Sequence, residues 1–375
     1  MNNFTNSLPG LYLHVPFCRS KCSYCDFYSI TDLSLVSTWL AALQKEVLIY
    51  QGSFAPFDSL YLGGGTPSLL DGRQLTALMA CLRRHFTFAP DTEVTLEANP
   101  DDLTLEKLAV FMYLGVNRLS VGVQSFAEQD LIFLGRRHTA RQAEQALKWS
   151  RAAGFTNLGI DLIYGLPAQR AEAWKKNLAR ALEFRPEHLS CYQLTLEAGT
   201  PLGARQVQGQ IKPLPEEDQR ELFLLTSRFL TEQGYIHYEI SNFARSETYY
   251  SRHNRKYWRH VPYLGLGPAA HSFHGGKRWW NHRSLDRYCQ ALALGEAQVA
   301  GSETLTAAQL HLESLYLGLR TKEGVALDLI RPQPRGDLML GELQKAGLVK
   351  VRHGRAAPTR EGFLVADRLP FCFGE

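Results

Sequence analysis

The chain has 375 residues, of which 45% are hydrophobic and 21% are charged, and its formal net charge is +4. This composition is typical of a globular protein of about two domains and argues against a low-complexity chain. No apolar run reaches the roughly 18–20 residues of a membrane span, and Met1–Gly10 lacks the pattern of a secretory leader. The small, dispersed charge gives little support to nucleic-acid binding. We therefore expect a soluble, cytoplasmic protein with no membrane span.

The first half of the chain alternates short β-type runs with amphipathic helical stretches. The expected strands are Leu11–Val15, Ser59–Leu62, Glu93–Glu97, Arg118–Val123, Leu158–Ile163 and Leu189–Thr195. The expected helices between them are Leu35–Tyr50, Gly72–His85, Leu105–Leu114, Ala140–Ala153 and Glu172–Phe184. This alternation predicts parallel βα units. Six such units predict an α/β barrel or partial barrel, with a flat doubly wound sheet as the alternative.

The pattern changes after about Gly209. Glu216–Gln233 predicts a helix and Tyr235–Phe243 a strand, and Tyr249–Trp280 is rich in glycine, histidine and aromatic residues. A basic, aromatic run within that last stretch could contact nucleic acid, but composition alone gives this interpretation little weight.

The last part of the chain has the pattern of a small separate module. Helical periods at Ala307–Leu319 and Leu338–Ala346 precede a short hairpin that begins at Gly347. Helix, helix and hairpin is a winged-helix-like order, and such modules either bind DNA or merely pack against protein. We expect three parts in the chain: a barrel core at 1–245, a connecting segment at 246–300 and a winged-helix-like α+β domain at 301–375.

Polar and glycine residues stand where five of the expected strands end. In chain order they are Cys18–Cys25, Gly63–Pro67, Glu97–Pro100, Gln124–Ser125, and Asp161 with Tyr164–Pro167. Parallel barrels gather their functional groups at these carboxyl ends. Each segment alone could be an ordinary turn or helix cap, but their coincidence predicts a site.

The cysteine spacing CxxxCxxC, formed by Cys18, Cys22 and Cys25, is the most specific of these signals. A structural zinc site closes with four protein ligands, whereas a four-iron cluster held by three thiolates leaves one iron open. A zinc site completed by His14 or Cys191 is the alternative, although both residues fit structural roles better. The other cysteines are scattered, and a reducing compartment suits these thiols.

An open iron can bind S-adenosylmethionine through its amino and carboxylate groups, and one electron then gives a carbon radical. A glycine-rich turn lets the backbone approach such a ligand closely. Carboxylates such as Glu97 and Asp161 can accept bonds from its ammonium or ribose groups, and an arginine can hold its carboxylate.

Together the motifs resemble those of radical S-adenosylmethionine enzymes and, more narrowly, of the oxygen-independent coproporphyrinogen dehydrogenase family. They are CxxxCxxC within Pro16–Phe27, GGGTPS at Gly63–Ser68, LEANP at Leu96–Pro100, GVQSF at Gly122–Phe126 and DLIYGLP at Asp161–Pro167. The resemblance covers nearly the whole chain. It implies a partial (β/α)6 barrel with a smaller C-terminal α+β domain, a [4Fe-4S] cluster and S-adenosylmethionine.

The resemblance also implies roles for individual residues. Cys18, Cys22 and Cys25 would ligate the cluster. The residues matching S-adenosylmethionine contacts are Tyr12, Gly64, Gly65, Thr66, Glu97, Gln124, Arg136 and Asp161. Arg136 is preferred because it keeps the family spacing from Gln124, and Arg137 is the alternative.

Two departures point to the heme-chaperone branch of that family. Phe27 stands where the decarboxylating relatives have a fourth cysteine, and only 17 residues precede Cys18, fewer than those relatives have. The HNxxYW motif that marks the branch is present at His253–Trp258. His253 is therefore the expected heme ligand; the residues left open as alternatives are His260, His271, His274 and His282. The motif alone could equally be a polar residue beside core aromatics.

The leading prediction is a heme chaperone that binds heme and passes it to an acceptor protein, such as one of the respiratory chain. The runner-up is an enzyme that oxidatively decarboxylates coproporphyrinogen III to protoporphyrinogen IX, and a radical methyltransferase is a third reading. We expect a monomer or homodimer that does not bind nucleic acid, and we assign no catalytic residue.

Overall fold

The computed structural model describes residues 7–54 and 56–373, so residues 1–6 of the segment assessed as a leader lie outside it. A central sheet has the strand order β12-β11-β10-β9-β1-β2-β3-β4-β5-β6-β8-β7. Its parallel strands are β1 (Gly10–Val15), β2 (Phe57–Gly64), β3 (Phe88–Ala98), β4 (Arg118–Gln124), β5 (Leu158–Tyr164), β6 (His188–Gln193) and β9 (Tyr263–Leu266). The predicted partial barrel of βα units is confirmed.

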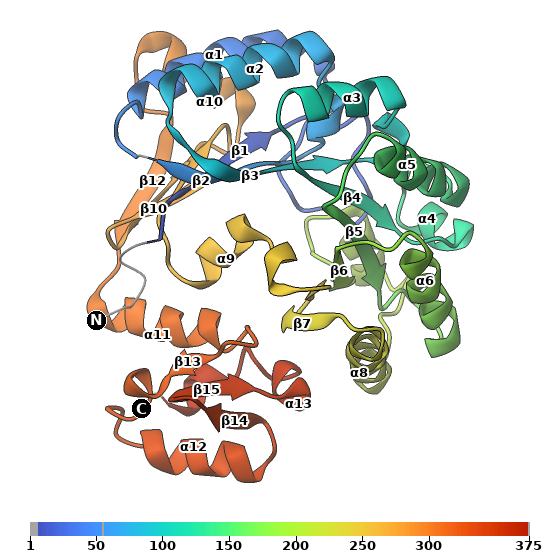
Figure 1. Ribbon diagram of the computed structural model, residues 1–375, viewed down its shortest axis with the longest axis vertical. Helices are drawn as coiled ribbons and strands as arrows, with labels where there is room; N and C mark the ends of the chain where they lie inside the picture. The colour runs from blue at the N-terminus through green and yellow to red at the C-terminus, as the bar shows by residue number, and fades with distance from the viewer. Residues whose placement is uncertain (1–6, 55, 374–375) are drawn as a thin grey trace.

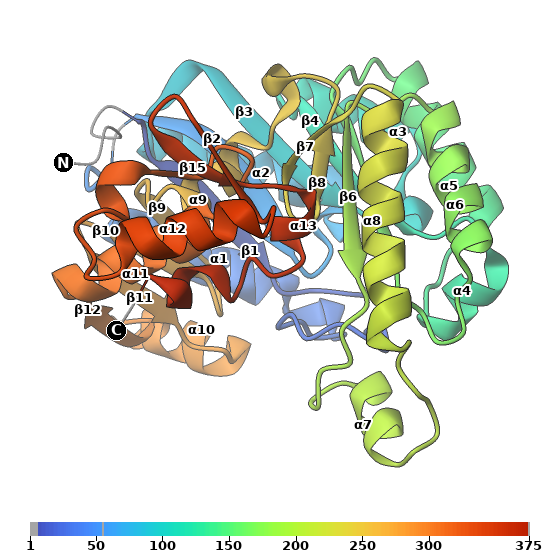
Figure 2. The ribbon, with the colours of Figure 1, turned by 90° about the horizontal axis from the view of Figure 1, so that it is seen from below.

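Helices cover the outer face of the curved sheet (Figure 1). The main ones are α1 (Val36–Ile49), α2 (Gly72–His85), α3 (Leu105–Tyr113), α5 (Ala140–Ala152), α6 (Ala171–Glu183) and α8 (Glu216–Glu232), with the shorter α4 (Glu128–Phe133). α7 (Pro201–Val207) stands apart from the sheet (Figure 2), and its Leu202 amide donates to the Ser23 carbonyl at 2.9 Å. Polar side chains cap the N-termini of several of these helices. Asp71 accepts the Gln74 amide of α2 at 2.8 Å, and Thr139 accepts the Gln142 amide of α5 at 3.2 Å.

Alternation along the strands separates the two faces of the barrel. In β1, Leu11, Leu13 and Val15 are fully buried against the helices, and Tyr12 and His14 between them point inward. The adjoining strands repeat this pattern, so polar side chains accumulate inside the barrel. This is why polar, functional side chains lie close together at the carboxyl ends of β1 to β5.

Antiparallel strands extend both edges of the parallel sheet. Beyond β9 lie β10 (His271–His274), β11 (Lys277–Asn281) and β12 (Val299–Thr304), with α10 (Leu285–Leu294) outside them. The region 246–300 therefore supplies strands to the central sheet, and β12 continues past residue 300.

Beyond β6 lie β8 (Asn242–Ala244) and β7 (Ile236–Glu239). The single strand predicted at Tyr235–Phe243 is wrong, because the chain reverses between these two antiparallel strands. The Glu239 carboxylate accepts the Ser241 amide at 3.0 Å and the Asn242 side chain at 2.7 Å, which stabilises the turn.

A short helix, α9 (Arg252–Trp258), crosses the inner side of the sheet and contacts β1 and β2 (Figure 1). Ser251 caps it by accepting the Asn254 amide at 3.3 Å. The HNxxYW motif is this helix, so its side chains lie against the barrel interior.

The C-terminal part packs below α9, and its own core is separate from that of the barrel (Figures 1 and 2). Its elements are α11 (Ala307–Gly318), β13 (Val325–Ala326), α12 (Gly336–Lys345), β14 (Val349–Arg352), β15 (Arg355–Pro358) and α13 (Arg360–Phe363). The three strands pair in the order β13-β15-β14, which confirms the predicted winged-helix-like α+β part.

Contacts to α9 join this part to the barrel. Arg255 donates to Glu323 at 2.8 Å, and Arg259 also pairs with that carboxylate. Within the described ranges, no helix is long and apolar enough to cross a membrane.

Candidate functional site

The three predicted cluster cysteines lie in the loop that follows β1. Backbone bonds fix both ends of the loop: the Cys18 amide donates to the Ile30 carbonyl at 2.9 Å, and the Ser23 amide donates to the Leu134 carbonyl at 3.3 Å. All three thiols are free and partly exposed. The loop thus presents its sulfurs at the carboxyl end of the barrel.

Two of these sulfurs accept hydrogen bonds from other strand ends. Thr66 Oγ1 donates to Cys18 Sγ at 3.3 Å, and Arg136 Nη1 donates to Cys22 Sγ at 3.3 Å. Donors beside sulfur stabilise thiolate ligands and tune a bound cluster.

The thiols are not arranged around a single ion. In the described part of the chain, no three His, Cys, Asp or Glu side chains stand close enough together to hold one metal ion. A four-iron cluster is larger, and each of its thiolates binds a different iron. The donor set of three cysteines, with Thr66 and Arg136 beside two of the sulfurs, fits such a cluster.

Glu97 and Asp161 point into the barrel from β3 and β5. Glu97 accepts the Tyr61 hydroxyl at 2.7 Å and the Gly64 amide at 3.2 Å. Burial raises the pKa of Glu97 to about 7. Ser120 donates to both carboxylate oxygens of Asp161, at 3.1 and 3.2 Å, and burial also raises the pKa of Asp161. Two desolvated carboxyl groups inside a barrel favour a cationic ligand.

The glycine turn after β2 packs against the end of β1. Gly64 has φ of +101°, and a Cβ there would lie 2.6 Å from the His14 ring. A Cβ on Gly65 would lie 2.6 Å from the Phe17 carbonyl oxygen. The Thr66 amide bonds to that same carbonyl at 2.8 Å. Only glycine permits this close approach, which places Thr66 beside Cys18.

Gln124 and Arg136 meet above Gly122 on β4. Arg136 Nη2 donates to the Gly122 carbonyl at 2.7 Å and also bonds Asn99. Gln124 Oε1 and Arg136 Nε are buried, and neither has a partner among the described residues. Gln124 also holds φ of +67°, an uncommon backbone conformation for a non-glycine residue. An orphaned acceptor beside an orphaned donor is what a polar ligand would satisfy.

The structure therefore brings the predicted S-adenosylmethionine contacts to one end of the barrel. Tyr12 lies slightly deeper, where its hydroxyl is 3.2 Å from His14 Nδ1. His14 Nε2 donates to the Tyr28 carbonyl at 2.8 Å. Cys191 is buried in the apolar core. His14 and Cys191, the alternative ligands for a zinc site, thus both make structural contacts. The assignment of individual contacts stays a prediction.

His253, the predicted heme ligand, lies near the opposite end of the strands. Its Nδ1 is 3.0 Å from Ser59 Oγ, its Nε2 is 2.8 Å from the Tyr257 hydroxyl, and the residue is 1% exposed. Burial lowers the pKa of His253 to about 3, so the ring is neutral. In this conformation both ring nitrogens are engaged. Heme ligation by His253 stays a prediction and would require α9 to move.

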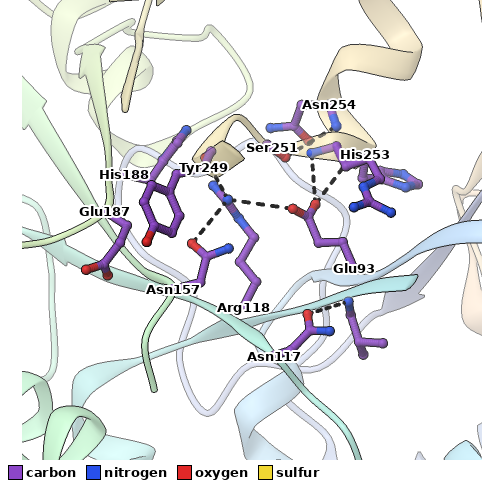
Figure 3. Close-up of polar contacts among 12 residues, drawn as sticks. Glu93, Asn117, Arg118, Asn157, Glu187, His188, Tyr249, Ser251, His253 and Asn254 are labelled. Atoms are coloured by element: carbon purple, nitrogen blue, oxygen red, sulfur yellow. Dashed lines mark hydrogen bonds and ion pairs between the residues drawn. The ribbon is translucent and has the colours of Figure 1, made fainter. Parts of the chain in front are cut away.

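A buried polar network beneath α9 was not foreseen from the sequence. Figure 3 shows Glu93 of β3 between Arg118 of β4 and the start of α9. Glu93 accepts the Arg252 amide at 2.9 Å, and the Arg118 guanidinium lies 3.8 Å from its carboxylate and donates to the Tyr249 carbonyl at 2.9 Å. The sequence did contain a signal for this network, because a charged residue at an inward position of a buried strand needs a partner.

A cavity of about 650 Å³ lies elsewhere, where α5 and α6 meet the start of β6. Its lining residues are Lys148, Arg151, Arg180, Glu183, Phe184, Arg185, Glu187 and Arg245. It contains none of the predicted site residues.

Comparison with known proteins agrees with this geometry. The Radical SAM superfamily matches residues 12–181, from Tyr12 in β1 to the end of α6. The solved structure of coproporphyrinogen III oxidase (HemN) from Escherichia coli, a radical SAM enzyme, is similar with a TM-score of 0.84. It is 28% identical and covers 98% of this chain and 90% of its own. The fold and the cysteine loop thus define a radical SAM protein.

Curated relatives narrow this class. The protein named heme chaperone HemW of Mycobacterium tuberculosis is 36% identical over 368 residues, covering 96% of this chain and 93% of that protein. Heme chaperone HemW of Bacillus subtilis is 32% identical over 378 residues, covering 96% and 98%. The chain belongs to the HemW family, a branch of the radical SAM proteins related to coproporphyrinogen III oxidase. The family resemblance seen in the motifs is confirmed.

Proposed function

We propose that this protein is a heme chaperone, which binds heme and passes it to an acceptor protein. The observation that carries the proposal is its similarity to proteins named heme chaperone HemW over 96% of its length. That length includes α9 and the C-terminal part as well as the barrel. Phe27, which is 68% exposed, agrees with this assignment because the position offers no fourth thiolate.

The same proposal includes a [4Fe-4S] cluster held by Cys18, Cys22 and Cys25, with exchangeable S-adenosylmethionine beside it. When bound, the cluster supplies an electron that can cleave a carbon–sulfur bond of S-adenosylmethionine. The orphaned atoms of Gln124 and Arg136 support a ligand at this place.

This chain's own residues would bind and orient that ligand. Arg136 can hold a carboxylate next to Cys22, because its guanidinium is already fixed by Gly122. Glu97 and Asp161 would accept bonds from ammonium or ribose hydroxyl groups. The Gly64 turn admits the ligand close to the backbone.

We further infer a cytoplasmic setting, a heme acceptor such as a respiratory-chain protein, and a monomeric or homodimeric state. The relatives' names and the unpaired thiols, which suit a reducing compartment, support this inference.

The proposal is tested by reconstituting the protein anaerobically with iron and sulfide and titrating it with heme. A heme chaperone should retain heme through gel filtration with a shifted Soret band, and it should pass that heme to an added apo-acceptor. A protein that holds its cluster but retains no heme would contradict the proposal.

A second candidate is oxidative decarboxylation of coproporphyrinogen III, favoured by the 28% identity to the Escherichia coli oxidase over 98% of this chain. Anaerobic incubation with reductant, S-adenosylmethionine and coproporphyrinogen would then give protoporphyrinogen. Cleavage of S-adenosylmethionine without that product would eliminate this activity.

A further inference from the structure

The inner face of the antiparallel extension is lined with aromatic side chains. Tyr12 of β1 is aligned with Gly265 of β9, so Tyr263, two residues earlier in β9, lies on the same inner face. Phe273 of β10 pairs with Tyr263, and their rings are 6.2 Å apart. The aromatic surface therefore continues from the barrel interior across β9 onto β10.

His271 and Trp280 extend this surface onto β11. The two residues pair directly in the β10–β11 ladder, and their rings stack with centroids 5.9 Å apart and an interplanar angle of 27°. Across the next ladder Trp280 faces Gly301 of β12, where a Cβ would lie 2.6 Å from the indole. The missing side chain at Gly301 thus leaves room for Trp280 to lie over β12.

His271 is accessible, as is His274 at the other end of the same strand. The side chain of His271 is exposed, and its ring has no hydrogen-bond partner among residues 7–54 and 56–373. By contrast, both ring nitrogens of His253 are engaged, and His260 contacts Ser314 and Glu313. An imidazole must have a free nitrogen to bind iron, and His271 has one in the folded state.

Two further histidines in this region lack the same surroundings. His274 is also on β10, but three residues along the strand it points to the outer face, where its ring contacts Phe54. His282 follows the end of β11 and has no aromatic neighbour in the described part of the chain. Among the histidines that the structure describes, only His271 combines an exposed imidazole with an inward aromatic neighbour.

We propose that His271 is the axial ligand of heme iron, and that the macrocycle lies on the inner face of β10 and β11 beside Trp280. This inference rests on the proposed heme-chaperone function and names its binding site. A neutral imidazole nitrogen donates its lone pair to the iron. The partly exposed indole of Trp280 can pack on the flat apolar ring.

The surroundings of His271 keep the imidazole in the form that binds iron. Partial burial and the nearby Arg278 guanidinium lower the pKa of His271, so the neutral ring dominates at neutral pH. Arg278 itself is held by Glu303 at 2.5 Å and by Glu313 at 2.8 Å.

The site would lie next to the S-adenosylmethionine contacts. β9 alone separates β10 from β1. With strands spaced about 4.8 Å apart, the backbones of His271 and Tyr12 are on the order of 10 Å apart. Heme and S-adenosylmethionine would then occupy neighbouring parts of one barrel interior, whereas His253 is a buried residue of α9, which packs against β1 and β2.

The test is a heme titration of the full-length, cluster-loaded protein and of four single variants: His271→Ala, His274→Ala, His282→Ala and His253→Phe. We expect His271→Ala to lose the imidazole-type Soret band and to bind heme about tenfold or more weakly. Added imidazole should restore the band in that variant. His274→Ala is the matched control on the opposite face of the same strand, and it should behave as wild type.

Each other result has a distinct meaning. An unchanged spectrum and affinity in His271→Ala, with loss in His253→Phe or His282→Ala instead, overturns the proposed ligand but leaves the chaperone function standing. Failure of the wild-type protein to retain heme overturns both. Cluster content and circular dichroism, measured on every variant, separate loss of a ligand from loss of fold.

Discussion

Arg136 donates a hydrogen bond to the sulfur of Cys22 at 3.3 Å, although the two residues are 114 positions apart. The other terminal nitrogen of the same guanidinium donates to the Gly122 carbonyl at 2.7 Å. Arg136 therefore ties the cysteine loop after β1 to the end of β4. A single side chain couples the proposed cluster to the proposed S-adenosylmethionine contacts.

The first prediction concerns this arginine. Arg136→Lys should weaken S-adenosylmethionine binding by about tenfold or more, because an ammonium cannot reproduce the planar set of donors. Equilibrium dialysis of the reconstituted protein measures the loss. Arg137→Lys is the matched control, since Arg137 is exposed and pairs with Asp101 at the surface; its affinity should stay near wild type. Equal losses in the two variants would contradict the assignment of Arg136.

The second prediction concerns the glycine turn. In Gly64→Ala the new Cβ would lie 2.6 Å from the His14 ring, and φ of +101° is strained for alanine. We expect weaker S-adenosylmethionine binding and a free energy of unfolding lower by about 1–3 kcal/mol.

Gly72→Ala is the control for this strain. Gly72 begins α2, where the nearest atoms to a new Cβ are 3.8 Å away. Alanine there should be neutral or stabilise by up to about 1 kcal/mol, with binding unchanged. Urea unfolding followed by circular dichroism compares the two. A harmless Gly64→Ala would show that the turn does not need glycine.

The sequence was informative where function demands an unusual residue at a strand end. The cysteines, the Gly64 turn, Glu97, Gln124 and Asp161 stand in segments whose polar or glycine content interrupts an apolar pattern. Parallel strands end at one side of a barrel, so the sequence alone predicts that these segments lie together.

The sequence pattern did not predict pairing or burial where these depend on segments far away in the chain. β9, β10 and β11 are short strands of 4, 4 and 5 residues. They join the sheet through the pairing of β9 with β1, which lies far away in the sequence. The His253 motif likewise gave no sign of its burial, because the residues that cover it, such as Ser59, belong to the barrel. Long-range pairing of this kind leaves no local periodicity.

The third prediction is a pH dependence of S-adenosylmethionine binding. The pKa of Glu97 is raised to about 7 by burial, so its ionised fraction grows as the pH rises through 7. Because the ligand is cationic, affinity should increase from pH 6 to pH 8, and Glu97→Gln should be weaker at pH 8 and lack this component of the increase.

The variant Tyr61→Phe tests the direction in which the pKa of Glu97 moves. Tyr61 donates to the Glu97 carboxylate at 2.7 Å, which favours the ionised form. Without that donor the pKa of Glu97 should rise further, and the binding profile should move to higher pH. Calorimetric titration at several pH values measures the shift, and a profile displaced to lower pH would contradict the argument.

The fourth prediction concerns His253 and acid stability. Its pKa is about 3 in the folded protein, below the 6.5 of an unperturbed histidine. As the pH falls below about 6.5, the unfolded chain takes up a proton on this ring and the folded protein does not. The free energy of unfolding therefore falls by up to about 1.4 kcal/mol per pH unit from this residue.

Replacing His253 by phenylalanine should remove that component of the acid sensitivity. At pH 7.5 the variant should be less stable by about 1–3 kcal/mol, because Ser59 and Tyr257 each lose a buried partner. Between pH 7.5 and pH 5.5 its stability should fall less steeply than that of wild type in urea unfolding. An equal fall in both proteins would mean that burial does not hold the His253 ring neutral.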